Sequence, residues 1–211
     1  MEEKTNMTAE RSLEIIRESI ENSQRTITKN SSLSLIWWGI CVFIFSLVIA
    51  YLWINHGGPV WNWLWAVMWA IGYIGNRIID KRKETIPVTF VGKTIGHVWN
   101  TFGIFCGCIG LILGLIGFGV IPESMVIHNE IDAHLYINIT SIISLCFGIA
   151  TMITGFILKN RIIQICGLIA GLGGFFVALN FPWAEQLFVM AAVGFIGLIV
   201  PGLLIYFQNQ K

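Results

Sequence analysis

The chain has 211 residues, of which 55% are hydrophobic and only 12% are charged, and its formal net charge is +1. This composition excludes a disordered chain and a nucleic-acid binder that relies on bulk charge, and it argues against an ordinary soluble domain, in which about a quarter of the residues are charged. We therefore expect an all-α integral membrane protein, in which a short polar segment precedes the membrane-spanning helices.

Residues 1–32 form that polar segment, which we expect to be cytoplasmic and to contain an amphipathic helix at about residues 8–29. Ser23 interrupts its apolar pattern, and Asn30, Ser31 and Ser32 predict its end. Five basic and six acidic residues among the first thirty give no net attraction to anionic lipid, so the helix is expected to dock on protein. That protein is the chain's own cytoplasmic face, a partner or a second copy, and a lipid surface is the less favoured alternative. The docking stripe, at spacings of 3, 4 and 7, consists of Leu13, Ile16, Ile20 and Ile27.

Residues 33–211 are expected to form a bundle of six transmembrane helices. Each apolar run is close to the ~20 residues that a spanning helix needs. None of the runs contains Asp, Glu or Lys, and Arg77 is the one Arg, next to the end of the second run. The predicted spans cover about residues 35–54, 60–78, 98–120, 137–158, 162–179 and 187–207.

The basic residues predict how these spans are oriented. Six spans place all thirteen Lys and Arg residues on one side of the membrane, and the three loops on the other side contain none. The positive-inside rule then predicts cytoplasmic N- and C-termini and three helical hairpins. We expect a multi-pass protein of a bacterial-type plasma (inner) membrane.

Three tryptophans recur at four-residue spacing on the second predicted span: Trp61, Trp65 and Trp69. One interpretation is the aromatic wall of a cavity for an apolar or cationic ligand. The other is a ridge that packs against a neighbouring helix or faces lipid, and the sequence favours this second interpretation.

A basic cluster follows the second predicted span and consists of Lys81, Arg82 and Lys83. Basic clusters beside a membrane-spanning helix bind anionic lipid head groups. The alternative is that these side chains only fix the orientation of the neighbouring spans.

Four groups that can bind a metal alternate in the loop between the third and fourth predicted spans: His128, Glu130, Asp132 and His134. Imidazole and carboxylate groups are suitable ligands for zinc or manganese, and histidine can also act as a pH sensor. The alternative is an ordinary solvated loop.

Glycines four residues apart predict close helix packing on the third and fifth spans, either inside the bundle or between two copies. The pairs are Gly103 with Gly107, Gly110 with Gly114, and Gly167 with Gly171. Pro201, within the sixth span, is expected to remove a backbone hydrogen bond and bend the helix.

No catalytic or nucleotide-binding motif is present in the sequence, and no charged residue lies near the middle of a span. We therefore expect a non-enzymatic interaction, regulatory or accessory membrane component, with no cofactor and no nucleic-acid partner. Its expected partners are the lipid bilayer and another protein or a second copy, bound through the N-terminal helix or the glycine-rich spans. The alternatives are a passive permease, channel or lipid-handling protein, and an outward-facing metal-binding protein.

Overall fold

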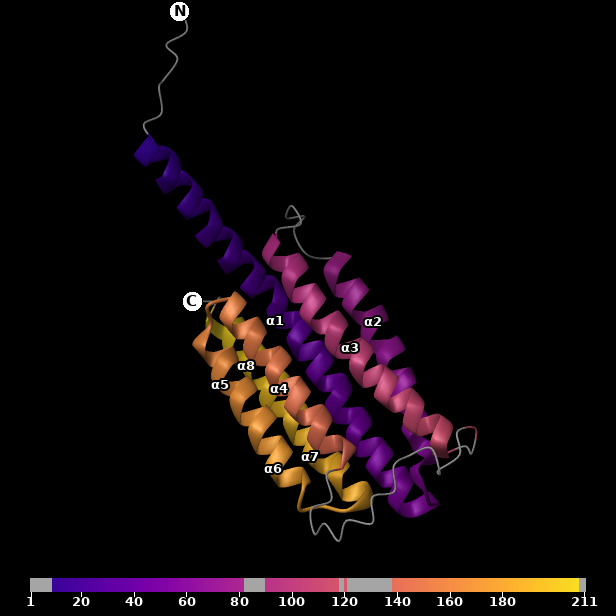
Figure 1. Cartoon of the computed structure of the whole chain (residues 1–211). Helices are drawn as coiled ribbons and strands as arrows, with labels where there is room; N and C mark the ends of the chain where they lie inside the picture. Colours follow the sequence, from indigo (N-terminus) through magenta and orange to yellow (C-terminus); the bar gives the residue numbers. More distant parts are fainter. Residues whose placement is uncertain (1–8, 82–89, 118–119, 121–137, 209–211) are drawn as a thin grey trace, which may run out of the picture.

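The computed structural model describes residues 9–81, 90–117, 120 and 138–208, and within these ranges every regular element is helical (Figure 1). In chain order these elements are α1 (Ala9–His56), the 3-10 turn η1 (Pro59–Trp63), α2 (Leu64–Lys81), α3 (Phe90–Gly117), α4 (Ile139–Ile157), α5 (Arg161–Leu168), the π-helical η3 (Ile169–Gly173), α6 (Gly174–Ala178), the 3-10 turn η4 (Trp183–Glu185), α7 (Gln186–Gly194), the π-helical η5 (Phe195–Ile199) and α8 (Val200–Gln208).

Five of the described helical stretches are long and apolar enough to cross a membrane, as expected of an all-α membrane protein. They are Ser31–His56, Gly92–Ile112, Ile139–Ile157, Arg161–Ala178 and Trp183–Gln208. They overlap the first, third, fourth, fifth and sixth predicted spans. The second predicted span corresponds to η1 and α2, whose last turns carry Arg77, Asp80 and Lys81.

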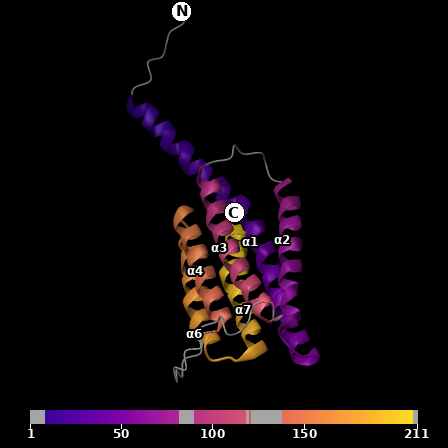
Figure 2. The same cartoon turned by 45° about the vertical axis from the view of Figure 1, so that its right-hand side comes forward.

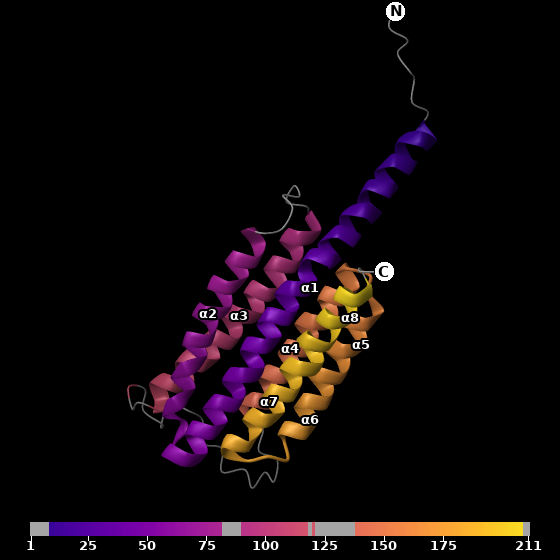
Figure 3. The same ribbon diagram turned by 180° about the vertical axis from the view of Figure 1, so that it is seen from behind.

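Helix α1 runs through the middle of the bundle, between the pair α2 and α3 and the group of helices that follows α4 (Figures 1 and 3). It packs against α2 on one side and against α7, η5 and α8 on the other. Ser46, Ile49 and Ala50 of α1 are completely buried there. The helix ends at Gly57 and Gly58, which both adopt positive φ and precede Pro59.

The predicted end of the N-terminal helix at Asn30, Ser31 and Ser32 is wrong, because α1 is one helix of 48 residues. Ser32 is only 2% exposed, and its carbonyl lies where α1 crosses Gly202 of α8. Asn and Ser only weakly disfavour a helix interior, so tertiary packing can carry the helix through them. The chain therefore has no break between its polar N-terminal segment and the bundle.

Glycine lets α4 pack backbone to backbone against α5 and η3. A Cβ atom added at Gly171 would lie 2.7 Å from the Cα atom of Gly148, and one at Gly167 would lie 2.8 Å from the Met152 nitrogen. The predicted packing role of Gly167 and Gly171 is thus confirmed, within one chain. At Gly107 of the third span, an added Cβ atom would meet no described residue within 4 Å, so packing there inside the bundle is not observed and packing between copies stays a prediction.

The π-helical segments η3 and η5 lie side by side, since Gly197 of η5 contacts Ala170 of η3 and the ring of Phe147. Segment η5 ends at Ile199, two residues before Pro201, which has no backbone N–H to donate. The N–H of Val200 donates to the carbonyl of Phe195, five residues back. The missing hydrogen bond predicted at Pro201 is therefore accommodated by a widened turn.

Helix α3 is the least enclosed of the possible spans. None of its Gly92–Ile112 stretch is buried inside the described structure. Its rings of Trp99 and Phe102 pack edge-on against Phe147 of α4, at 5.8 and 5.9 Å between centroids. Figure 2 shows α3 in front of α1, between α4 and α2.

Candidate functional site

The first part of α1 projects beyond the bundle (Figures 1 and 2). Leu13, the first residue of the predicted docking stripe, is 66% exposed, and Ile15 on the opposite face is 48% exposed. Arg17 and Glu18 are exposed as well. We call residues 9–29 the α1 extension. The side chains of the other three stripe residues, Ile16, Ile20 and Ile27, lie outside the described part of the structure.

The continuity of α1 relates Leu13 to the buried part of the same helix. At about 3.6 residues per turn, thirty-six residues make ten turns, so Leu13 lies on the same face of α1 as Ile49. Ile49 is completely buried inside the bundle. Leu13 therefore continues, outside the bundle, a face of α1 that is buried inside it.

Two tryptophans of α1 bind α2 at two glycines. The indole nitrogen Nε1 of Trp37 donates a hydrogen bond to the carbonyl of Gly72, at 3.0 Å. The Trp37 ring covers Gly75, and the Trp38 ring covers Gly72. Because α1 and α2 run in opposite directions, Lys81, nine residues beyond Gly72, lies level with about residue 29 of α1. The roles of Gly72 and Gly75 could not be predicted from the sequence, although the adjacent tryptophans were a signal for an aromatic contact.

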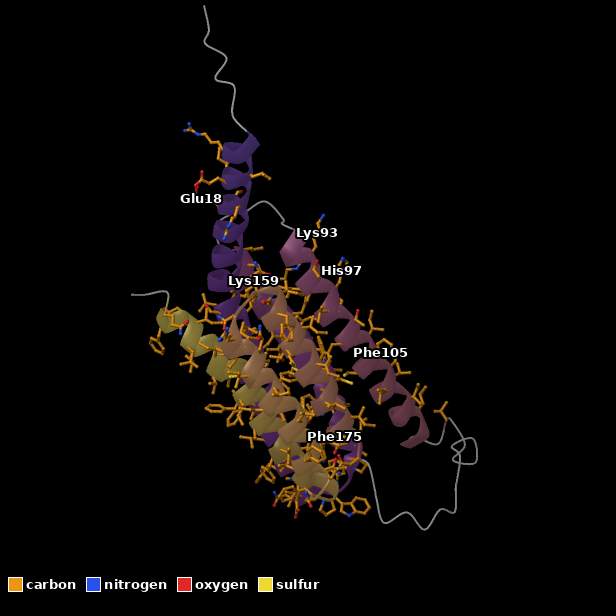
Figure 4. All side chains as sticks on the ribbon, turned by 60° about the vertical axis from the view of Figure 1, so that its left-hand side comes forward. Glu18, Lys93, His97, Phe105, Lys159 and Phe175 are labelled. Atoms are coloured by element: carbon orange, nitrogen blue, oxygen red, sulfur yellow. The ribbon has the colours of Figure 1, made fainter. Side chains whose placement is uncertain are left out.

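Exposed basic side chains lie on the last turns of α2 and on the first turn of α3. Arg77, Lys81 and Lys93 are exposed there, with Asp80 as an acidic neighbour. The Arg77 guanidinium donates two hydrogen bonds to the Tyr73 hydroxyl, at 3.0 and 2.6 Å, and so lies along α2. Figure 4 shows Lys93 and His97 on the same end of the bundle as Lys159. We call Arg77, Lys81 and Lys93 the basic end; the predicted head-group residues Arg82 and Lys83 lie outside the described residues.

The three tryptophans predicted as a cavity wall or packing ridge all contact other helices. Trp61 and Trp65 pack against a buried cluster that contains Ile49 and Leu187. Trp69 meets Trp38 edge-on, at 5.2 Å between ring centroids, and lies over Gly103 of α3. These contacts favour the packing interpretation.

The predicted metal ligands His128, Glu130, Asp132 and His134 lie outside the described residues, so the structure does not place them. Among the residues that are described, no three His, Cys, Asp or Glu side chains gather as metal ligands. The imidazole ring of His56 lies near the ring of Trp61, at 6.2 Å between ring centroids.

Buried polar groups between the helices mostly bond to the backbone. The hydroxyls of Ser46, Thr151 and Thr154 each donate to the carbonyl four residues earlier, at 2.7 to 2.9 Å. Two buried side-chain atoms in the described chain have no hydrogen-bond partner, the Asn76 oxygen Oδ1 and the Ser144 hydroxyl, and the hydroxyl lies against Gly174 in a tightly packed contact. The bonded hydroxyls are satisfied within their own helices.

Asn138 belongs to an Asn-x-Thr sequence but is 3% exposed. Its side-chain oxygen accepts hydrogen bonds from the backbone and hydroxyl of Ser141, and its side-chain nitrogen donates to the carbonyl of Ala178. Asn138 therefore caps α4 and ties it to the end of α6, and in the folded chain it is inaccessible to a glycosylating enzyme.

No protein-family model matches this chain, and neither a curated protein nor a solved structure shows significant similarity to it. The features of the chain that bear on its function are therefore the exposed α1 extension and its continuity with the bundle.

Proposed function

We propose that this chain is a non-enzymatic membrane component that acts by interaction, as an accessory or regulatory subunit, and that the α1 extension is its docking element. The observation that carries the proposal is the continuity of α1 from the exposed Leu13 to the buried Ile49. A partner that binds the extension thereby contacts a helix that forms part of the bundle core, so binding can bias how the bundle packs.

We further propose six spans, with η1 and α2 as the second, and cytoplasmic termini in a bacterial-type plasma membrane. Helix α2 lies along α1 through the contacts of Trp37 and Trp38, at the depth of the helices that are long enough to cross. Arg77 is near the end of α2, where a long basic side chain reaches the membrane interface.

The test compares two substitutions on opposite faces of the α1 extension. Leu13→Asp should abolish partner capture from native membranes, because it places a charge on the docking stripe. Ile15→Asp makes the same chemical change on the other face and should leave capture unchanged. Both side chains are exposed, so neither change should affect insertion or folding.

Deletion of residues 1–30 should reproduce the Leu13→Asp result and still leave the protein in the membrane. Normal capture by the deleted protein, at normal membrane levels, would contradict the proposal.

A further inference from the structure

Helix α3 has few partners inside its own chain. None of its Gly92–Ile112 stretch is buried, whereas between 33% and 61% of the most apolar part of each of the other four possible spans is buried. In the described structure, α4 is the only helix against which α3 packs extensively. That contact uses one face of α3, where the rings of Trp99 and Phe102 meet Phe147 of α4. In Figure 2, α3 lies at the front of the bundle.

The side of α3 that is turned away from α4 carries an exposed line of residues at the spacing of a helix–helix seam. Asn100, Ile104, Gly107 and Leu111 follow one another at intervals of four, three and four residues, as the core positions of a heptad pattern do. Ile104 and Leu111 are 65% and 64% exposed, and Asn100 and Gly107 are exposed as well. We call these four residues the α3 seam.

Asn100 lies at the middle height of the bundle. Its neighbour Trp99 packs on Phe147, which is the ninth of the nineteen residues of α4. From Phe147 to the end of α4 at Ile157 the helix rises by ~15 Å. The predicted third span begins at residue 98, which would place Asn100 near the membrane surface, so the structure moves this residue inward. Because α4 is long enough to cross a bilayer, its middle lies in hydrocarbon, and Asn100 lies at that depth.

An asparagine side chain at this depth needs hydrogen-bond partners. Its amide has both a donor group and an acceptor group. Among the described residues, none forms a hydrogen bond with the Asn100 side chain. Hydrocarbon tails supply neither a donor nor an acceptor, so an amide that faces them is costly. The α3 seam is therefore a surface that lipid alone covers poorly.

We propose that the α3 seam pairs with the α3 seam of a second copy of this chain, around a two-fold axis along the membrane normal. Copies inserted in the same direction present the same residues at the same depth, so Asn100 meets its counterpart. Each amide can then donate to the carbonyl of the other. A single polar residue in such a seam sets the register of the two helices, and Gly107 has no side chain to keep them apart.

A helix of a different protein fits the seam less well than a second copy. It would need a polar group of its own at the depth of Asn100 and on the matching face, whereas a second copy supplies this group by symmetry. This inference does not depend on the α1 extension, because α3 and α1 use different surfaces of the molecule.

Disulfide cross-linking of full-length chains in native membranes tests the pairing. In a background without the native cysteines, Ile104→Cys and Leu111→Cys should each give a product with the mass of two copies when copper phenanthroline is added. Phe105→Cys is the matched control, because Phe105 is also 65% exposed but points about 100° away from Ile104 around the helix. Equal yields from positions 104 and 105 would indicate random collision and would overturn the proposal.

Substitution of Asn100 tests what holds the two copies together. The measurement is energy transfer between labelled full-length chains in phosphatidylcholine vesicles, at decreasing ratios of protein to lipid. Asn100→Leu should raise the dissociation constant about tenfold, because the paired amides are lost. Thr101→Leu changes a polar residue at the same depth but outside the seam, and it should leave the dissociation constant unchanged. Asn100→Gln keeps an amide and should retain most of the association.

The outcomes separate this inference from the proposed function. Monomers at every ratio of protein to lipid, or unchanged association of the Asn100→Leu variant, overturn the inference while docking through the α1 extension stands. A cross-link from position 104 to a different polypeptide also overturns it and assigns the seam to a partner protein. If Leu13→Asp leaves partner capture intact, the docking proposal fails and the pairing of α3 stands.

Discussion

Single glycines determine how closely the second half of this molecule packs. A helix surface without side chains lets α4 approach η3 until Gly148 and Gly171 touch through their backbones. In a membrane such contact matters because helices gain little from the hydrophobic effect against each other and associate through close packing. An added methyl group at this point has no flexible side chain to displace.

Gly148→Ala should therefore destabilise the protein by about 1–3 kcal/mol, the usual cost of overpacking a tight contact. Gly107→Ala is the matched control, because a Cβ atom at Gly107 would meet nothing within 4 Å. Thermal unfolding in detergent measures the stability of both variants. Equal midpoints for the two variants would show that the backbone contact of Gly148 contributes nothing to stability.

The hydrogen bond from Trp37 to Gly72 makes a second prediction at this scale. Trp37→Phe keeps an aromatic ring over Gly75 but removes the indole N–H that joins α1 to α2. We expect a loss of about 1 kcal/mol. Trp63→Phe, at an exposed position of η1, should have no comparable effect in the same unfolding measurement.

Among the elements, α1 shows where sequence reasoning succeeded and where it failed. The apolar run that begins near residue 35 and the stripe headed by Leu13 were both recognisable from periodicity. That these two segments form one continuous helix was not recognisable, because Asn30, Ser31 and Ser32 are locally typical of a helix end. Only the contact of Ser32 with Gly202 explains why the helix continues. The glycines of α3 show the same limit, since Gly103 meets Trp69 while Gly107 meets no described residue, and spacing alone does not show which glycine has a partner.

A spin-label distance tests the continuity of α1. Labels at Glu18 and Tyr51, in a background without native cysteines, are separated by 33 residues of helix and should give a narrow distribution near ~50 Å. Asn30→Pro should shorten and broaden this distribution, because proline interrupts a helix interior. Asn30→Ala should leave it narrow. A broad distribution in the unsubstituted chain would mean that the α1 extension is not rigidly joined to the bundle.

For the whole molecule, the distribution of charge predicts how the chain crosses the membrane. Single cysteines at the exposed positions His56 and Glu185 should react with a membrane-impermeant maleimide added outside the cell. Cysteines at Lys81 and Lys159 should react only after the membrane is opened. Labelling of position 81 from outside would show that α2 does not cross, and would contradict the proposed six spans.

The class of the fold could be read from composition and hydropathy, because a bilayer requires long apolar helices. The arrangement of those helices could not be read from composition and hydropathy. Which glycine meets a backbone, as Gly171 does, and which faces open space, as Gly107 does, depends on contacts between distant segments.

The packing of α1 against α7 and α8 also affects the biosynthesis of the protein. Helix α1 gains α2 as a partner early, but its partners on the other side exist only when the last helices have been made: Gly39 meets Ile199, and Gly202 meets Ile36. Until then the buried Ser46 has no need of a second helix, because its hydroxyl already donates to the Val42 carbonyl of the same helix. A chain that terminates before residue 186 would thus carry α1 without its partners on that side.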